Sequence, residues 1–77
     1  MTAKELVIAI MEAKAVREEV AGWRSLSTVV LSPKALGRIE GYMGVENLVS
    51  LAGMPVRTDP CLPYPFLVRR REPHEAS

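Results

Sequence analysis

Hydrophobic residues near the start of the chain recur at helical spacing. Thr2 and Glu5 lie three residues apart, which is the spacing of a capping box at the beginning of a helix. Apolar residues then follow at alternating intervals of three and four, a pattern typical of a helical seam. The residues of this seam are Leu6, Ala9, Ala13, Val16, Val20 and Trp23. The pattern therefore predicts a long amphipathic helix over residues 2–23.

The first half of this helix carries further apolar residues that fall largely outside the seam. These residues are Val7, Ile8, Ile10 and Met11. Together with the seam they make the first half of the helix apolar on nearly every side. A small domain has little material with which to cover two sides of a helix. We therefore expect these four residues to bind a second chain, with burial inside the domain as the alternative.

The middle of the chain changes to shorter elements. Residues 28–31 are β-branched or apolar and predict a short strand that is buried on both faces. Ser32 and Pro33 fit the N-cap and first position of a helix that ends near Tyr42. The apolar residues of segment 45–51 predict a further turn or two of helix, which Gly53 ends.

The C-terminal third is predicted to form a β-hairpin. Segments 54–58 and 64–70 provide the strands, and the Asp- and Pro-containing segment 59–63 provides the turn. The order of elements is helix, strand, one or two short helices, strand, strand, which defines an α+β class. We expect one domain over residues 1–71 and a flexible polar tail over residues 72–77.

Two stretches of this half of the chain resemble a known family. The run TVVLSPKALGRI (28–39) and the later run LVSLAGMPVRTDPCLP (48–63) are similar to the axial-domain segment of tailed-phage major capsid proteins. The resemblance spans residues 28–70 and implies a phage or prophage origin. The 77 residues leave no room for the long backbone helix, extended loop and N-terminal arm of a shell-forming capsid protein. The resemblance therefore implies an axial-domain-like module used on its own.

Charge and composition exclude several kinds of site. The net charge of +1 gives no overall attraction to nucleic acids or acidic membranes. The single cysteine, Cys61, and the single histidine, His74, are too few for a protein-built zinc site or an internal disulfide. His74 lies in the polar tail, where no rigid scaffold would hold it against a nucleophile. We therefore expect no catalytic residues, no metal, no cofactor and no membrane association, and we expect a non-enzymatic protein.

Two groups of residues remain as candidate contacts outside the first helix. Trp, Tyr and Arg are enriched at binding hot spots, and the first group is Trp23, Arg24, Tyr42 and Met43. The second group is a basic cluster formed by Arg69, Arg70 and Arg71. Alternate strand residues point to opposite faces, so the cluster is divided between two sides. A nucleic-acid-binding accessory that uses this cluster is a further alternative function.

These observations together predict a protein-binding module that acts by occupying a surface. The expected role is a structural or assembly accessory of a phage, and its partner is a second copy, a phage structural protein or a host protein. The alternative is a host-directed inhibitor that blocks a host enzyme, polymerase or defence complex. We expect a homo-oligomer that is located in the host cytoplasm or the virion and is not secreted.

Overall fold

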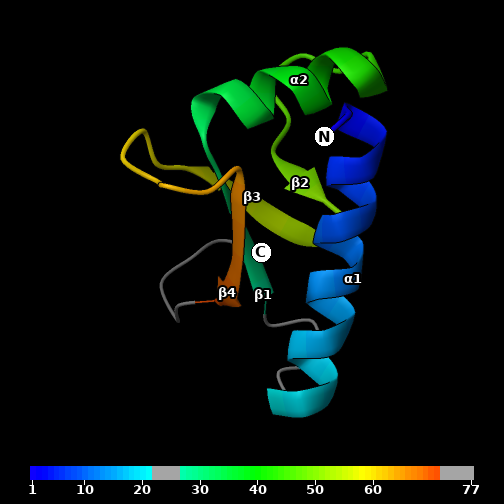
Figure 1. Ribbon diagram of the computed structural model, residues 1–77, viewed down its shortest axis with the longest axis vertical. Helices are drawn as coiled ribbons and strands as arrows, with labels where there is room; N and C mark the ends of the chain where they lie inside the picture. Colours follow the sequence, from blue (N-terminus) through cyan, green and yellow to red (C-terminus); the bar gives the residue numbers. More distant parts are fainter. Residues whose placement is uncertain (22–26, 72–77) are drawn as a thin grey trace.

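The computed structural model describes residues 1–21 and 27–71. Within them the elements are α1 (Ala3–Ala21), β1 (Ser27–Leu31), α2 (Pro33–Met43), β2 (Ser50–Leu51), β3 (Met54–Thr58) and β4 (Phe66–Arg70). The strands form one mixed sheet in the order β2-β3-β1-β4 (Figure 1). The predicted α+β class is thereby confirmed. Trp23, Arg24 and the tail at 72–77 lie outside the described residues.

Both helices pack on the same face of the sheet. Strand β1 lies between β3 and β4, and all five of its residues are buried, as predicted for a strand covered on both faces. The side chains shared by the helices and the sheet form one hydrophobic core. Its members are Leu6, Ile10, Val29, Leu31, Ala35, Ile39, Leu51, Met54 and Val68.

The start of α1 is the capping box that the sequence predicts. The backbone N–H of Thr2 donates to Glu5 Oε1 at 2.9 Å, and the backbone N–H of Glu5 donates to Thr2 Oγ1 at 3.2 Å. These reciprocal bonds satisfy backbone donors that have no partner inside the helix. The bonds from Thr2 also hold the pKa of the Glu5 carboxyl below its ordinary value of 4.5.

Removing the Thr2 hydroxyl should raise the pKa of Glu5 towards its ordinary value. Because folding lowers this pKa, the carboxylate stabilises the fold above the pKa of the unfolded chain, and that stabilisation disappears as pH falls through the folded value. Thr2→Ala should therefore shift the NMR titration of the Glu5 carboxyl to higher pH. Thr2→Ser keeps the hydroxyl and serves as the control. Identical Glu5 titrations in wild type and Thr2→Ala would show that the hydroxyl does not contribute to the lowered pKa and that the Thr2 backbone N–H, which both proteins keep, accounts for it.

Helix α2 begins at the residues that the sequence assigns to its start and ends close to the predicted end near Tyr42. Ser32 is the N-cap, its Oγ accepts from the N–H of Ala35 at 3.2 Å, and Pro33 is the first helical residue. Gly44 ends the helix in the left-handed conformation, with φ 68°. This conformation is favourable for glycine because it has no Cβ.

The prediction of a further helix over residues 45–51 is wrong. Residues 45–49 form a connection, and Ser50–Leu51 is strand β2, which pairs antiparallel with β3. Ala52 and Gly53 join these strands with φ values of 52° and 78°. Two consecutive positive φ values are required by the tight turn whose twist matches a hairpin. Gly53 therefore serves a β-turn instead of a helix end.

The predicted hairpin between segments 54–58 and 64–70 is also wrong, although both strands exist. β1 lies between them and pairs parallel with β3 and antiparallel with β4. The connection over residues 59–65 crosses the end of β1, where the N–H of Asp59 donates to the Leu31 carbonyl and the N–H of Ser32 donates to the Pro65 carbonyl. A seven-residue connection is long enough to cross a strand, whereas tight hairpin loops need only about two to five residues.

Candidate functional site

The side of α1 that faces away from the sheet carries exposed apolar residues. Ile8 is 45% exposed and Met11 is 53% exposed, whereas Ile10 is fully buried in the core. Val7 packs partly buried against the core. The structure therefore confirms the outward position of Ile8 and Met11 but corrects that of Ile10 and Val7. Ala15 is also exposed and follows Ile8 and Met11 on the same side of the helix. We call Ile8, Met11 and Ala15 the outer strip.

The predicted seam of α1 is only partly internal. Leu6 is buried and Ala13 packs against the core, but Val16 and Val20 are exposed. The last turn of α1 extends beyond the ends of β1 and β4 (Figure 1), and none of the strands that the structure describes lies beneath it. The buried face of α1 includes Leu6 and Ile10 and continues to the partly buried Lys14 and Glu18, so the second half of the predicted seam falls outside it.

A polar contact fixes the rotation of α1 about its axis. Ser27 is fully buried at the start of β1, and its hydroxyl donates to Glu18 Oε2 at 2.9 Å. The other Glu18 oxygen accepts from Lys14 Nζ at 2.9 Å. A buried hydroxyl needs such a partner, so Lys14 and Glu18 turn towards the domain while Val16 and Val20 turn away. The spacing of apolar residues along α1 does not indicate this rotation, because the residues that turn towards the domain here are charged.

The second group of candidate contacts lies at the C-terminal end of α2. Tyr42 and Met43 are 54% and 43% exposed in the last turn of that helix. Val45, in the connection that follows, is exposed as well. Beside them, Glu40 Oε2 accepts from the N–H of Leu48 at 2.8 Å and holds the connection against the helix. The structure thus places Tyr42 and Met43 on an accessible and locally anchored surface.

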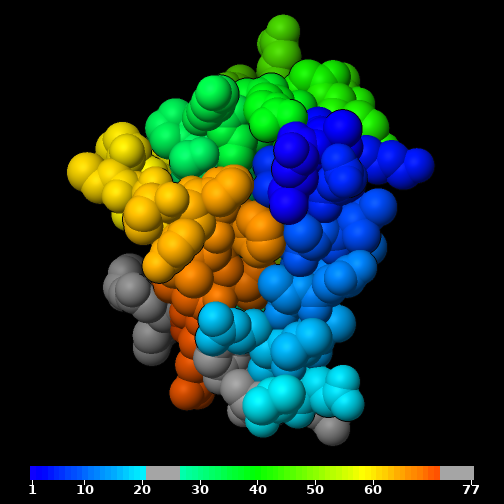
Figure 2. Space-filling model, viewed as in Figure 1, coloured from blue at the N-terminus to red at the C-terminus, as the bar shows by residue number. Residues whose placement is uncertain are grey.

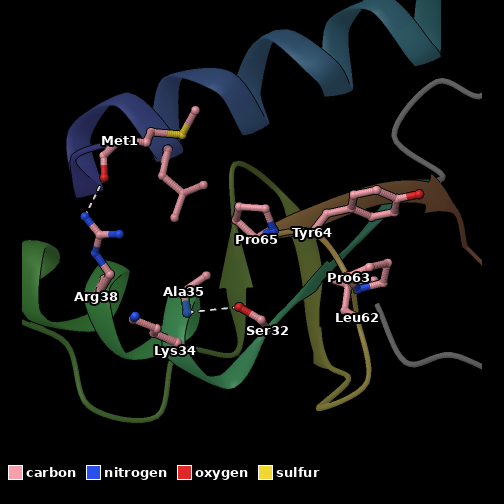
Figure 3. A pocket seen from close by; sticks show the side chains of 10 residues that line it. Met1, Ser32, Lys34, Ala35, Arg38, Leu62, Pro63, Tyr64 and Pro65 are labelled. Carbon is pink, nitrogen blue, oxygen red and sulfur yellow. Dashed lines mark hydrogen bonds between the residues drawn. The ribbon is translucent and has the colours of Figure 1, made fainter.

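A groove of about 310 Å³ opens where three segments of the chain meet. The first turn of α1, the start of α2 and the segment before β4 surround it, as the space-filling view shows (Figure 2). Figure 3 shows Lys34 and Arg38 on one side and Tyr64 on the other, with Ala35 and Pro65 between them. The full lining is Met1, Leu6, Ser32, Lys34, Ala35, Arg38, Leu62, Pro63, Tyr64 and Pro65.

The residues of this groove are not close together in the sequence. Its cations come from α2 and its aromatic residue from the connection to β4, about thirty positions later. No motif links Lys34 or Arg38 to Tyr64, because only the return of the chain across the end of β1 brings them together. An exposed Tyr between prolines was the single available signal.

The basic cluster is divided between different environments. Arg69 is opposite Thr28 and Arg70 is opposite Ser27 in the β1–β4 ladder, so their side chains leave opposite faces of the sheet. Arg71 is half-buried, and its Nη2 donates to the Ser27 carbonyl at 3.3 Å. The three arginines therefore do not form one basic surface, in agreement with the expectation from strand alternation.

Within residues 1–21 and 27–71, no cluster of His, Cys, Asp and Glu side chains could hold a metal ion. Cys61 is exposed, and its N–H donates to Asp59 Oδ1 at 2.9 Å, which makes Asp59 a turn residue. Over the same part of the chain, neither helix combines the length and apolar character needed to cross a membrane.

Comparisons with known proteins give no indication of function for this chain. No protein-family model, curated protein or solved structure matches this chain. What the outer strip of α1, the end of α2 and the groove could bind therefore follows only from their own residues.

Proposed function

We propose that this chain is a non-enzymatic protein-binding module that associates with a second copy of itself through the outer strip of α1. The observation that carries the proposal is the exposure of Ile8 and Met11, large apolar side chains on consecutive turns of one helix. Contiguous exposed apolar surface is typical of protein–protein contact sites.

The charges at the ends of the strip favour a second copy in antiparallel orientation. Lys4 precedes Ile8 by one turn, and Glu19 follows Ala15 by one turn, so the strip begins with a cation and ends with an anion. An antiparallel pair that sets Ile8 against Ala15 also sets Lys4 against Glu19. A two-fold axis repeats each of these contacts. A parallel pair in register would instead place like charges together.

The size of the strip indicates a reversible dimer. A stable interface buries about 800 Å² on each partner, and three residues of one helix provide only part of that area. We therefore expect the average mass to rise with concentration. Light scattering coupled to size-exclusion chromatography, across about a hundredfold range of concentration, measures it.

Charge exchange tests both the surface and the orientation. Lys4→Glu and Glu19→Lys should each weaken the dimer, because like charges then meet at both ends of the interface. The double variant Lys4→Glu/Glu19→Lys should restore association to about the wild-type level, because each pair is reversed but still opposite in sign. Failure of the double variant to recover would contradict the antiparallel pair. Wild-type protein that stays monomeric at every concentration would contradict self-association itself.

Substitution of the strip supplies an independent test. Ile8→Glu and Met11→Glu place charges on a surface that is already accessible, so each variant should remain folded and become monomeric. A folded variant that still dimerises would show that the dimer uses another surface. Circular dichroism verifies the fold, and light scattering gives the mass.

For the biological role, we propose a structural or assembly accessory of a phage. The support is the resemblance of residues 28–70 to the axial-domain segment of tailed-phage capsid proteins, together with the exposed strip. Such an accessory should be present in purified particles or assembly intermediates. A host-directed inhibitor would instead be absent from both and would co-purify with a host protein.

A further inference from the structure

We propose that the groove between α1, α2 and the segment before β4 binds an extended acidic peptide of a partner protein. This inference goes beyond self-association, because the groove and the outer strip have no residue in common. The peptide has two carboxylates in the pattern acidic-x-acidic and an apolar residue next to them.

The charge of the groove defines the chemistry of its occupant. Lys34 and Arg38 are exposed on consecutive turns of α2, and none of the ten lining residues is an Asp or Glu. Arg38 Nη2 donates to the Met1 carbonyl, which orients the guanidinium at the edge of the groove (Figure 3). The net charge of the chain is only +1. The groove is therefore locally positive although the chain as a whole is nearly neutral, and this local charge favours an anionic ligand.

Two backbone N–H groups at the start of α2, those of Ala35 and Leu36, already have partners. Ser32 caps the helix through its Oγ bond to the Ala35 N–H, and its carbonyl accepts from the Leu36 N–H at 2.9 Å. The proposal therefore rests on the side chains of this helix. Lys34 and Arg38 are four residues apart on one helix, and such side chains begin about 5–6 Å apart. Alternate residues of an extended peptide are about 6.6–6.8 Å apart, so an acidic-x-acidic pattern matches the two cations.

The other side of the groove is suited to an apolar side chain. Tyr64 is 59% exposed, and Leu62, Pro63 and Pro65 surround it. An aromatic ring among prolines provides a rigid apolar surface that requires little ordering on binding. At about 310 Å³ the groove is at the small end of ligand pockets, of about 300–1,000 Å³. An extended peptide can continue beyond it in both directions, whereas a small molecule would be largely uncovered.

Selection from a displayed library of random peptides, with the wild-type protein immobilised, tests this inference. The peptides that are enriched should contain two Asp or Glu residues in the acidic-x-acidic pattern beside Leu, Pro or an aromatic residue. The affinity of one selected peptide, labelled with fluorescein, is then measured by anisotropy. It should decrease about tenfold for Lys34→Glu/Arg38→Glu and severalfold between about 0.1 M and 1 M NaCl.

Matched variants locate the binding site. Lys34→Glu alone retains the Arg38 bond to Met1 and should also weaken binding. Tyr64→Ala should weaken binding without a change of charge. Arg70→Glu makes an equivalent charge reversal at the far end of β4 and should have no effect, and circular dichroism should show every variant folded.

Each other outcome would overturn the proposal. These outcomes are no enrichment, enrichment of uncharged peptides, equal affinity for Lys34→Glu/Arg38→Glu and wild type, or displacement of the peptide by a single-stranded oligothymidylate as effectively as by unlabelled peptide. Ile8→Glu separates this inference from self-association. That variant should bind the peptide with wild-type affinity even when it is monomeric, so either proposal can fail while the other stands.

Discussion

Ile10→Glu is expected to unfold the protein, whereas Ile8→Glu, two positions earlier on the same helix, is expected to leave the fold intact. Ile10 is fully buried among the core residues, but Ile8 is 45% exposed. A carboxylate buried without a partner costs several kcal/mol or forces the element apart. A chain of fewer than about 80 residues seldom has more than about 3–5 kcal/mol of stability to lose.

The comparison is controlled because both variants make the same chemical change on the same helix. Circular dichroism at increasing temperature should show a cooperative transition for Ile8→Glu and none for Ile10→Glu. A folded Ile10→Glu variant would mean that Ile10 faces a second chain, as its position on the helical wheel suggests. The mass of the Ile8→Glu variant then reports on self-association independently of folding.

Leu31→Ala is expected to destabilise the fold by about 2–5 kcal/mol, because it removes a fully buried side chain and leaves a cavity. Leu67→Ala should cost about 1 kcal/mol, since Leu67 is only partly buried. These two leucines belong to neighbouring strands of one ladder. Leu31 is paired with Phe66 and Leu67 with Val30, which places the two leucines on opposite faces of the sheet.

Urea denaturation measures the free energy of unfolding for this pair. Equal losses for the two variants would contradict the arrangement in which both helices cover the face that contains Leu31. If Leu31→Ala does not fold, Leu31→Val and Leu67→Val provide a milder pair with the same expected order. The slope of the unfolding free energy against urea concentration should be the same for both variants. An equal slope would show that they differ in stability and not in the surface that unfolding exposes.

The sequence determines the elements whose stabilising contacts are local. The Thr2–Glu5 capping box begins α1, and Ser32 with Pro33 begins α2, as predicted. β1 is short and buried on both faces, which its continuous apolar composition indicates. Ile8 and Met11 are exposed, as expected for a surface that meets a second chain, although Val7 and Ile10, which were predicted with them, are not. Each of these features depends on residues close together in the chain.

The local signals fail where two structures share the same pattern. Gly53 could end a helix or complete a tight turn, and the positive φ of Ala52 decides for the turn. Two strands separated by a turn-rich segment can be neighbours or can enclose a third strand. Here β1 lies between β3 and β4 and forms ladder hydrogen bonds with both, and the residues of the connecting segment do not indicate this arrangement.

Only the tertiary structure decides which sides of α1 are free. The apolar spacing shows that the helix is amphipathic, but Ser27, Glu18 and Lys14 set its rotation. The groove likewise depends on contacts between Arg38 and Met1 and on the passage of residues 59–65 across the end of β1. Periodicity describes one element at a time, whereas an interaction surface is what remains after all elements have packed together.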